Sequence, residues 1–100
     1  MIRGITRIAF DLDGTIIDIG DKPRYSIINL LIALSALPST YITVWSGGGY
    51  EYARHWVEKL GLGEYVSDIC AKHQPNNIDI AFDDMAEEDV TQLAKVAVLV

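Results

Sequence analysis

Three features of this 100-residue chain predict an α/β fold with a mostly parallel central sheet. Short apolar runs alternate with longer segments whose apolar residues recur at helical spacing, which is typical of parallel strands joined by helices. Half of the residues are hydrophobic, so a packed core is expected. Several apolar runs end in carboxylates or glycines, as strands do when they lead into a site at a sheet edge.

The first part of the chain is predicted to form a strand, a loop and a helix, at residues 5–10, 13–22 and 23–37. The strand is an apolar run bounded by a turn signal. Glycines interrupt the segment that follows, which predicts the loop. Pro23 suits the first turn of the helix, Asp21 is the expected cap, and Pro38 ends it.

The rest of the chain is predicted to alternate in the same way. The expected elements are a strand at 41–45, a turn at 46–49, a helix at 50–60, strands at 65–70 and 78–82, a helix at 87–94 and a strand at 96–100. The strand at 41–45 is β-branched and aromatic, and Gly61 is a plausible helix C-cap. The final run is apolar throughout, as in strands covered on both faces. Right-handed crossovers would place helices on both faces of the sheet.

Composition limits the classes of partner and compartment. The net charge is 8 − 14 = −6, so nucleic acid and anionic membranes are unlikely partners. Cys70 is the only cysteine, which excludes an internal disulfide and fits a reducing cytoplasm. There is no signal-peptide pattern and no apolar run near the roughly 20 residues of a membrane span. We expect a soluble, cytoplasmic protein, and the apolar first helix and C-terminus are compatible with a homo-oligomer.

Polar side chains follow the predicted strands at one edge of the sheet. They are the carboxylates Asp11, Asp13, Asp83 and Asp84, the hydroxyl of Ser46 and the ammonium of Lys72. Strand side chains alternate, so Asp11 and Asp13 are expected to leave the sheet on the same side. Carboxylates gathered in one place repel each other and need a cation, a shared proton or a reaction to justify the arrangement. If a cation neutralises them, hard oxygen ligands in such number favour Mg²⁺.

The glycines after the second strand add an anion site to this edge. Gly47 and Gly48 precede a predicted helix, so their N–H groups could cradle an anion at its positive end. A cation site, an anion cradle, a lysine and a carboxylate nucleophile together describe phosphoryl transfer.

The same residues resemble the motifs of a known family, the haloacid dehalogenase-like (HAD) phosphohydrolases. Residues 11–15 (Asp-Leu-Asp-Gly-Thr) look like motif I, 44–47 (Val-Trp-Ser-Gly) like motif II, Lys72 like the motif III lysine, and 82–84 (Phe-Asp-Asp) like motif IV. The intervals of 46 − 11 = 35, 72 − 46 = 26 and 83 − 72 = 11 residues keep the family's order. The resemblance covers essentially the whole chain.

The resemblance implies a fold and an activity. Residues 1–100 would be one HAD-like catalytic core domain, a three-layer Rossmann-like fold with no cap domain. The protein would be a Mg²⁺-dependent phosphatase that hydrolyses a phosphate monoester through an aspartyl-phosphate. The substrate would be a phosphorylated small molecule or a phosphoprotein.

The resemblance also implies a role for each site residue. Asp11 would be the nucleophile, and Asp13 would be the general acid and then the base. Ser46 would bind the transferring phosphoryl group, and Lys72 would offset developing charge. The metal would be held by the carboxylate of Asp11, the backbone carbonyl of Asp13 and the pair Asp83 and Asp84, with Asp84 favoured as the direct ligand.

One departure from the family keeps an alternative open. The family has a helix between the motif III lysine and the motif IV strand, whereas eleven residues separate Lys72 from Asp83 here. Lys72 therefore either enters the site from a different direction than in the family or contributes less to the role of the motif III lysine. The alternative function is a non-catalytic Mg²⁺- and phosphate-binding module of the same fold. A phospho-receiver domain fits less well, because its acceptor aspartate would stand at the third strand, where the chain has Cys70.

Overall fold

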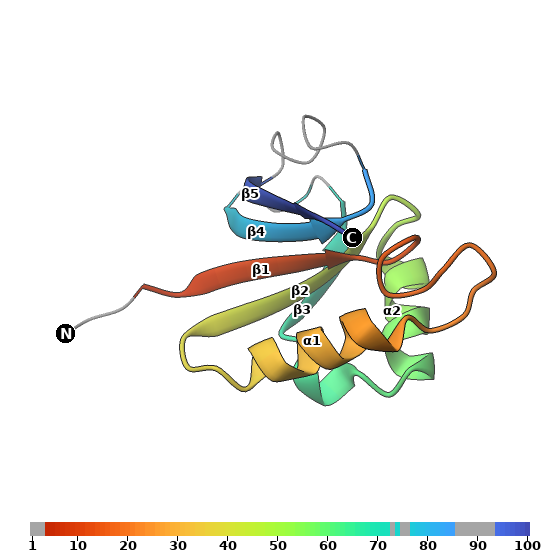
Figure 1. Ribbon diagram of the computed structural model, residues 1–100, viewed down its shortest axis with the longest axis horizontal. Coiled ribbons are helices and arrows are strands. Elements are labelled where there is room, and N and C mark those ends of the chain that lie inside the picture. Colours follow the sequence, from red (N-terminus) through yellow and green to blue (C-terminus); the bar gives the residue numbers. More distant parts are fainter. Residues whose placement is uncertain (1–3, 73, 75–76, 86–93) are drawn as a thin grey trace.

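The computed structural model describes residues 4–72, 74, 77–85 and 94–100, and five strands in this part of the chain form one parallel sheet. The strands are β1 (Thr6–Asp11), β2 (Thr40–Ser46), β3 (Asp68–Ala71), β4 (Ile78–Asp83) and β5 (Ala94–Leu99). They lie in the order β3-β2-β1-β4-β5, and every pair is parallel. The predicted α/β fold is confirmed. All carboxyl ends consequently meet at one edge of the sheet (Figure 1).

The two described α-helices pack on one face of this sheet. They are α1 (Tyr25–Ser35) and α2 (Tyr50–Lys59). Leu31 of α1 and Val57 of α2 join Phe10 and Val44 of the sheet in one buried apolar cluster. The steps from β1 to β2 and from β2 to β3 go in the same direction, so right-handed crossovers put both helices on the same side. The expectation of helices on both faces is not met in the described residues, and the helix predicted at 87–94 lies outside them except for Ala94, which begins β5.

The loop after β1 is wound tightly and carries the first site residues. The carbonyl of Leu12 accepts the N–H groups of residues 15, 16 and 17 at 3.2, 3.0 and 3.1 Å. Ile17 then forms bridges with Asp13 and Pro23. Leu12, Ile16 and Ile17 are fully buried beneath this turn. The loop is therefore part of the core, which gives the site a fixed support.

The start of the first helix differs from the prediction. The helix begins at Tyr25 after Arg24, and no side chain caps it. Asp21 has a left-handed backbone (φ 59°) and is not the cap. Asp18 is the residue that organises this turn, because its carboxylate accepts the N–H groups of residues 20 and 22 at 2.8 and 2.9 Å. Those bonds hold the chain in a turn up to Pro23, so the helix starts later.

The third strand also differs from the predicted range of 65–70. A short 3₁₀-helix, η1 (Gly63–Tyr65), occupies the start of that range, and pairing with β2 begins only at Thr43↔Asp68. The remaining strands lie within two residues of their predicted bounds.

The sheet order β3-β2-β1-β4-β5 differs from the flavodoxin-like order 2-1-3-4-5 of receiver domains. This difference weighs against the phospho-receiver alternative.

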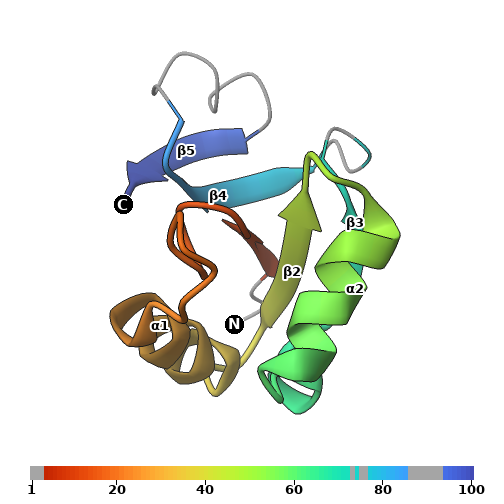
Figure 2. The same ribbon diagram turned by 90° about the vertical axis from the view of Figure 1, so that its right-hand side faces the viewer.

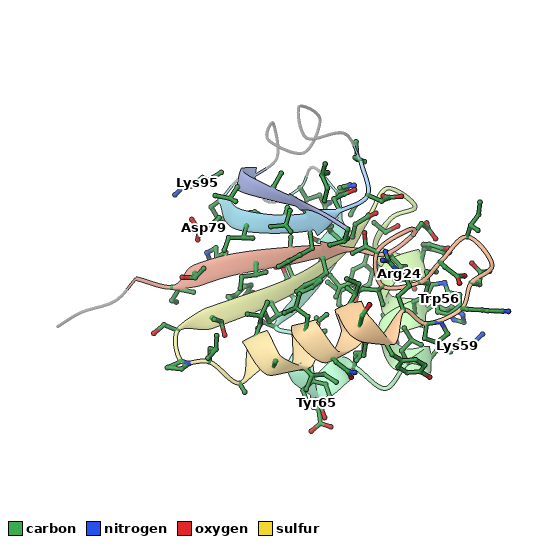
Figure 3. All side chains as sticks on the ribbon, in the orientation of Figure 1. Arg24, Trp56, Lys59, Tyr65, Asp79 and Lys95 are labelled. Carbon is green, nitrogen blue, oxygen red and sulfur yellow. The ribbon has the colours of Figure 1, made fainter. Side chains whose placement is uncertain are left out.

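The opposite edge of the sheet, where the strands begin, is held together by a polar cluster. Asp79 of β4 accepts the backbone N–H of Arg7 at 2.9 Å and pairs with Lys95 of β5 at 3.1 Å. These two contacts lower the pKa of Asp79. Figure 3 shows Asp79 and Lys95 together at this end, far from Arg24 at the other.

No helix in the described residues has the length and apolarity of a bilayer-spanning segment.

Candidate active site

Three carboxylates meet at the carboxyl ends of β1 and β4. Asp11 ends β1, Asp83 ends β4, and Asp84 follows directly. The two strands are neighbours in register, and the rings of Phe10 and Phe82 stack with centroids 4.7 Å apart. One oxygen from each of the three carboxylates lies within 4.8 Å of the others. Figure 2 views the molecule from the side toward which these strand ends point.

Lys72 reaches this carboxylate cluster from β3. Its backbone N–H donates to the carbonyl of Ser46 at 3.0 Å, which extends the β2–β3 pairing by one residue. Its Nζ then lies 3.3 Å from Oδ1 of Asp11 and 2.6 Å from Oδ2 of Asp83. The first contact is a hydrogen bond, whereas the second has the distance of an ion pair without hydrogen-bond alignment. The short interval between Lys72 and Asp83 therefore does not keep the lysine out of the cluster.

Burial controls the electrostatics of Asp11. Asp11 is only 6 % exposed, and this burial, together with the neighbouring charge of Asp83, raises the pKa of Asp11 from 3.8 to about 7 although Lys72 opposes the shift. Burial alone would lower the pKa of Lys72, but the ion pairs with Asp83 and Asp11 outweigh burial and raise the pKa of that ammonium. Lys72 therefore stays positively charged throughout the neutral range.

The charge balance of the cluster favours a cation. With all groups ionised, three carboxylates and one ammonium leave two negative charges. Asp83 is fully buried, and its Oδ1 is already bonded to the backbone N–H of Met85 at 2.9 Å. Asp84, by contrast, is exposed and lies beside Asp11. Asp11, Asp83 and Asp84 could thus hold a metal ion, and their all-oxygen chemistry is that of a hard divalent cation.

Gly14 makes room for the Asp84 carboxylate. It has a left-handed backbone (φ 82°), and a Cβ built at this position would overlap the carboxylate of Asp84. The loop after β1 and the segment after β4 are therefore in direct contact at the rim of the cluster. Only glycine meets both the backbone and the space requirement here.

Replacing Gly14 by alanine is therefore expected to displace Asp84. The matched control is Gly61→Ala, because Gly61 has a similar φ of 69° but no atom within 4 Å of its added Cβ. The control should lose about 1–2 kcal/mol of unfolding free energy from backbone strain alone, and Gly14→Ala should lose more. Calorimetry should also show Mg²⁺ binding weakened by about ten- to a hundredfold in Gly14→Ala only. Equal Mg²⁺ affinity in the two variants would exclude Asp84 from the metal site.

The raised pKa of Asp11 predicts opposite pH trends with and without metal. Without metal, the folded protein keeps a proton that the unfolded chain releases, so stability should fall as the pH rises from about 4 to about 7 and then level off. A divalent cation held by Asp11 would compete with that proton, so any rise in Tm caused by Mg²⁺ should grow over the same range. Thermal unfolding in EDTA and in Mg²⁺ between pH 5 and pH 8.5 measures both trends. A Mg²⁺ effect that does not change with pH would contradict the role of Asp11 as a ligand.

Asp13 lies apart from the carboxylate cluster, contrary to the expectation of four carboxylates together. Strand β1 ends at Asp11 and the chain turns at Leu12, so strand alternation does not continue to Asp13. Its side chain is exposed, and its Oδ1 accepts a hydrogen bond from the hydroxyl of Tyr52 at 2.8 Å. Asp13 therefore stands at the rim, and its carboxylate is not a member of the group that could hold the metal.

The end of β2 forms the turn predicted at residues 46–49. Ser46 is buried, and its Oγ accepts the N–H of Gly48 at 3.0 Å, so the hydroxyl hydrogen is free to donate elsewhere. The carbonyl of Ser46 accepts the N–H of Gly49 at 3.1 Å. Gly47 and Gly48 are exposed, and helix α2 begins directly after Gly49. The turn therefore presents small residues at the positive end of a helix, next to Lys72.

Three contacts in this region were not foreseen from the sequence. They come from Tyr52, which bonds Asp13; Met85, whose Sδ lies 3.0 Å from Lys72 Nζ; and Arg24, which donates to the carbonyl of Gly14 at 2.6 Å. The sequence could have indicated a position near the site only for Tyr52, because this residue lies in the first turn of the helix that follows the glycines. The partners of Arg24 and Met85 depend on how the loops fold back, which no local pattern encodes.

Comparisons with protein-family models, with curated proteins and with solved structures found no match to this chain.

Proposed function

We propose that this protein is a Mg²⁺-dependent phosphatase that hydrolyses a phosphate monoester through an aspartyl-phosphate at Asp11. The observation that carries the proposal is the meeting of Asp11, Asp83, Asp84 and Lys72 at one edge of a parallel sheet. These residues come from the carboxyl ends of three different strands. The order of the motifs, which resembles that of HAD-like phosphohydrolases, supports the same activity.

The side chains of the cluster suit Mg²⁺ in number and type. Asp11 and Asp84 would provide oxygen ligands, while Asp83, which forms an ion pair with Lys72 and accepts the N–H of Met85, would hold the cluster in shape. Mg²⁺ commonly uses one or two carboxylates, waters and a phosphate oxygen. When bound, it would neutralise the carboxylates and the phosphate and keep Asp11 ionised at neutral pH.

The proposed reaction uses residues of this chain in two steps. In the first, a carboxylate oxygen of Asp11 bonds to phosphorus as the bond to the leaving oxygen breaks, and Asp13 gives that oxygen a proton. In the second, Asp13 removes a proton from water, whose oxygen bonds to phosphorus and releases Asp11 and inorganic phosphate. Lys72 offsets the charge that develops at phosphorus, and Ser46 donates its hydroxyl hydrogen to the phosphoryl group.

The exposed rim favours a substrate that approaches from solvent. Asp13, Asp84, Gly47 and Gly48 are all exposed. No described segment covers these residues in the way a cap domain would. We therefore propose a phosphoprotein or a phosphorylated small molecule as the substrate. The net charge of −6 makes a nucleic-acid end a poorer candidate.

An assay on a generic aryl phosphate tests the proposal directly. Phosphate release should require Mg²⁺ and stop in EDTA, and a phosphorylated metabolite and phosphopeptide panel should then identify the substrate class. If calorimetry shows Mg²⁺ or phosphate binding while turnover on the whole panel stays at background, the protein is a binding module rather than an enzyme. Absence of both binding and turnover would exclude both functions.

A further inference from the structure

Tyr52 connects helix α2 to the loop after β1 at the rim of the carboxylate cluster. It lies in the first turn of α2, and its hydroxyl donates to Oδ1 of Asp13, a residue 39 positions earlier in the chain, at 2.8 Å. Asp13 makes no other side-chain hydrogen bond to a described residue. The two oxygens of its carboxylate therefore differ, because Oδ1 accepts the hydrogen bond from Tyr52 and Oδ2 accepts no hydrogen bond from a described side chain.

The ring of Tyr52 is held in place by its surroundings. A Cβ added to Gly48 would lie 3.0 Å from Cδ2 of Tyr52 and 3.4 Å from Oγ of Ser46, so the ring passes closely over the glycine turn. The ring also packs against the main apolar core. The partial packing of the ring against the core keeps the hydroxyl beside Asp13.

We propose that Tyr52 is a positioning residue for Asp13, a proposal that rests on the phosphatase function above. The Tyr52 O–H points at Oδ1, so a proton on Asp13 belongs on Oδ2. In the first step that proton leaves Oδ2 for the leaving oxygen as the P–O bond breaks and the Asp11–phosphorus bond forms. In the second step Oδ2 takes a proton from the attacking water. Tyr52 keeps its own proton throughout and never touches the substrate.

Leaving-group dependence separates this role from a merely structural one. An alkyl phosphate has a poor leaving group that needs a proton, whereas a nitrophenyl phosphate leaves well without one. Tyr52→Phe keeps the ring and removes only the hydroxyl. It should lower kcat/KM for the alkyl phosphate by about tenfold and for nitrophenyl phosphate by less than about twofold, since general acid catalysis is worth about 10²–10⁴-fold in all.

The control variant is Tyr50→Phe. Tyr50 lies on the same helix, is 47 % exposed, and makes no side-chain hydrogen bond to another described residue. The Tyr50→Phe substitution should leave kcat/KM unchanged for both substrates. Thermal unfolding of both variants should show that they fold like the parent protein.

An Asp13→Asn background tests whether Tyr52 acts through Asp13. If it does, adding Tyr52→Phe to Asp13→Asn should cause no further loss with either substrate, because the proton is already missing. An equal loss on both substrates, or an additive loss in the double variant, would overturn the positioning role while leaving the phosphatase function intact. A parent protein inactive on every phosphate would overturn the phosphatase function and this inference with it.

Discussion

Asp11→Asn is expected to reduce phosphatase activity by at least about a thousandfold, because an amide cannot carry the charge of the attacking oxygen. The substitution keeps the size and shape of the side chain at a site that is only 6 % exposed. Burial and the neighbouring Asp83 raise the pKa of Asp11 to about 7, so its charged form is disfavoured in the folded protein without metal. The uncharged amide should therefore leave the metal-free protein at least as stable as the parent at pH 8.

Opposite effects on activity and stability are the signature of a residue kept for chemistry. The experiment measures phosphate release in Mg²⁺ and urea unfolding in EDTA on the same samples. Asp68→Asn is the matched control, since Asp68 is an exposed carboxylate where β3 begins, at the opposite end of that strand from Lys72. The Asp68→Asn substitution should change neither phosphate release nor stability to urea. Undiminished turnover in Asp11→Asn would rule out an aspartyl-phosphate at this position.

Lys72→Met is expected to be the most destabilising substitution at the site. The Lys72 side chain is 7 % exposed, and its Nζ pairs with both Asp11 and Asp83. The methionine fills similar space but leaves two carboxylates in the interior without their cation. Removing one member of a buried charge group typically costs about 3–5 kcal/mol. A loss of that order is expected in EDTA at pH 8.

Two conditions should reduce that loss. Mg²⁺ supplies positive charge to the same carboxylates, and lowering the pH below about 7 allows Asp11 to take up a proton. Urea unfolding at pH 8 and pH 5.5, each with EDTA and with Mg²⁺, measures both effects. The control is Lys59→Met, because the exposed Lys59 lies over the Trp56 ring, with its Nζ 4.7 Å from the ring centroid. Figure 3 labels both residues. That contact is worth roughly 0.5–1 kcal/mol at an exposed site. Similar losses in the two variants, or none for Lys72→Met, would mean that Lys72 does not neutralise the buried pair.

Loss of Lys72 should also lower turnover under conditions where the protein is folded. Its ammonium is the positive charge beside Asp11 in the described part of the site. The activity loss must therefore be measured in Mg²⁺, where the variant is stable enough to compare with the parent. This separates the electrostatic contribution to catalysis from the contribution to folding.

The sequence alone was sufficient to predict the sheet and the edge at which the carboxylates gather. The apolar runs that became β1, β2, β4 and β5 were located from the sequence, and their bounds differ from the predicted ones by two residues at most. The last run was predicted to be covered on both faces, but β5 is an edge strand with Val96 52 % and Leu99 53 % exposed in the described structure. Parallel strands share one carboxyl edge, so residues that follow them must meet there. This is why the sequence predicts the proximity of Asp11, Asp83 and Asp84.

Local pattern was a poor guide where the chain turns. The later start of α1 depends on bonds from the Asp18 carboxylate, and the late start of β3 depends on the 3₁₀ turn before it. Asp13 was expected beside Asp11 because strands alternate, but β1 ends at Asp11 and the rule no longer applies beyond it. Such boundaries are decided by a few hydrogen bonds whose free energies are comparable to the differences in residue propensity.

The remaining features of the site were decided by tertiary structure alone. Whether Lys72 reaches Asp11 depends on β3 lying beside β2, and the contact of Tyr52 with Asp13 depends on how helix α2 meets the loop after β1. The pKa of Asp11 depends on how much water the fold excludes. Residue type and periodicity describe neighbours along the chain. Distances between remote segments, and the desolvation of a charge, exist only once those segments have packed.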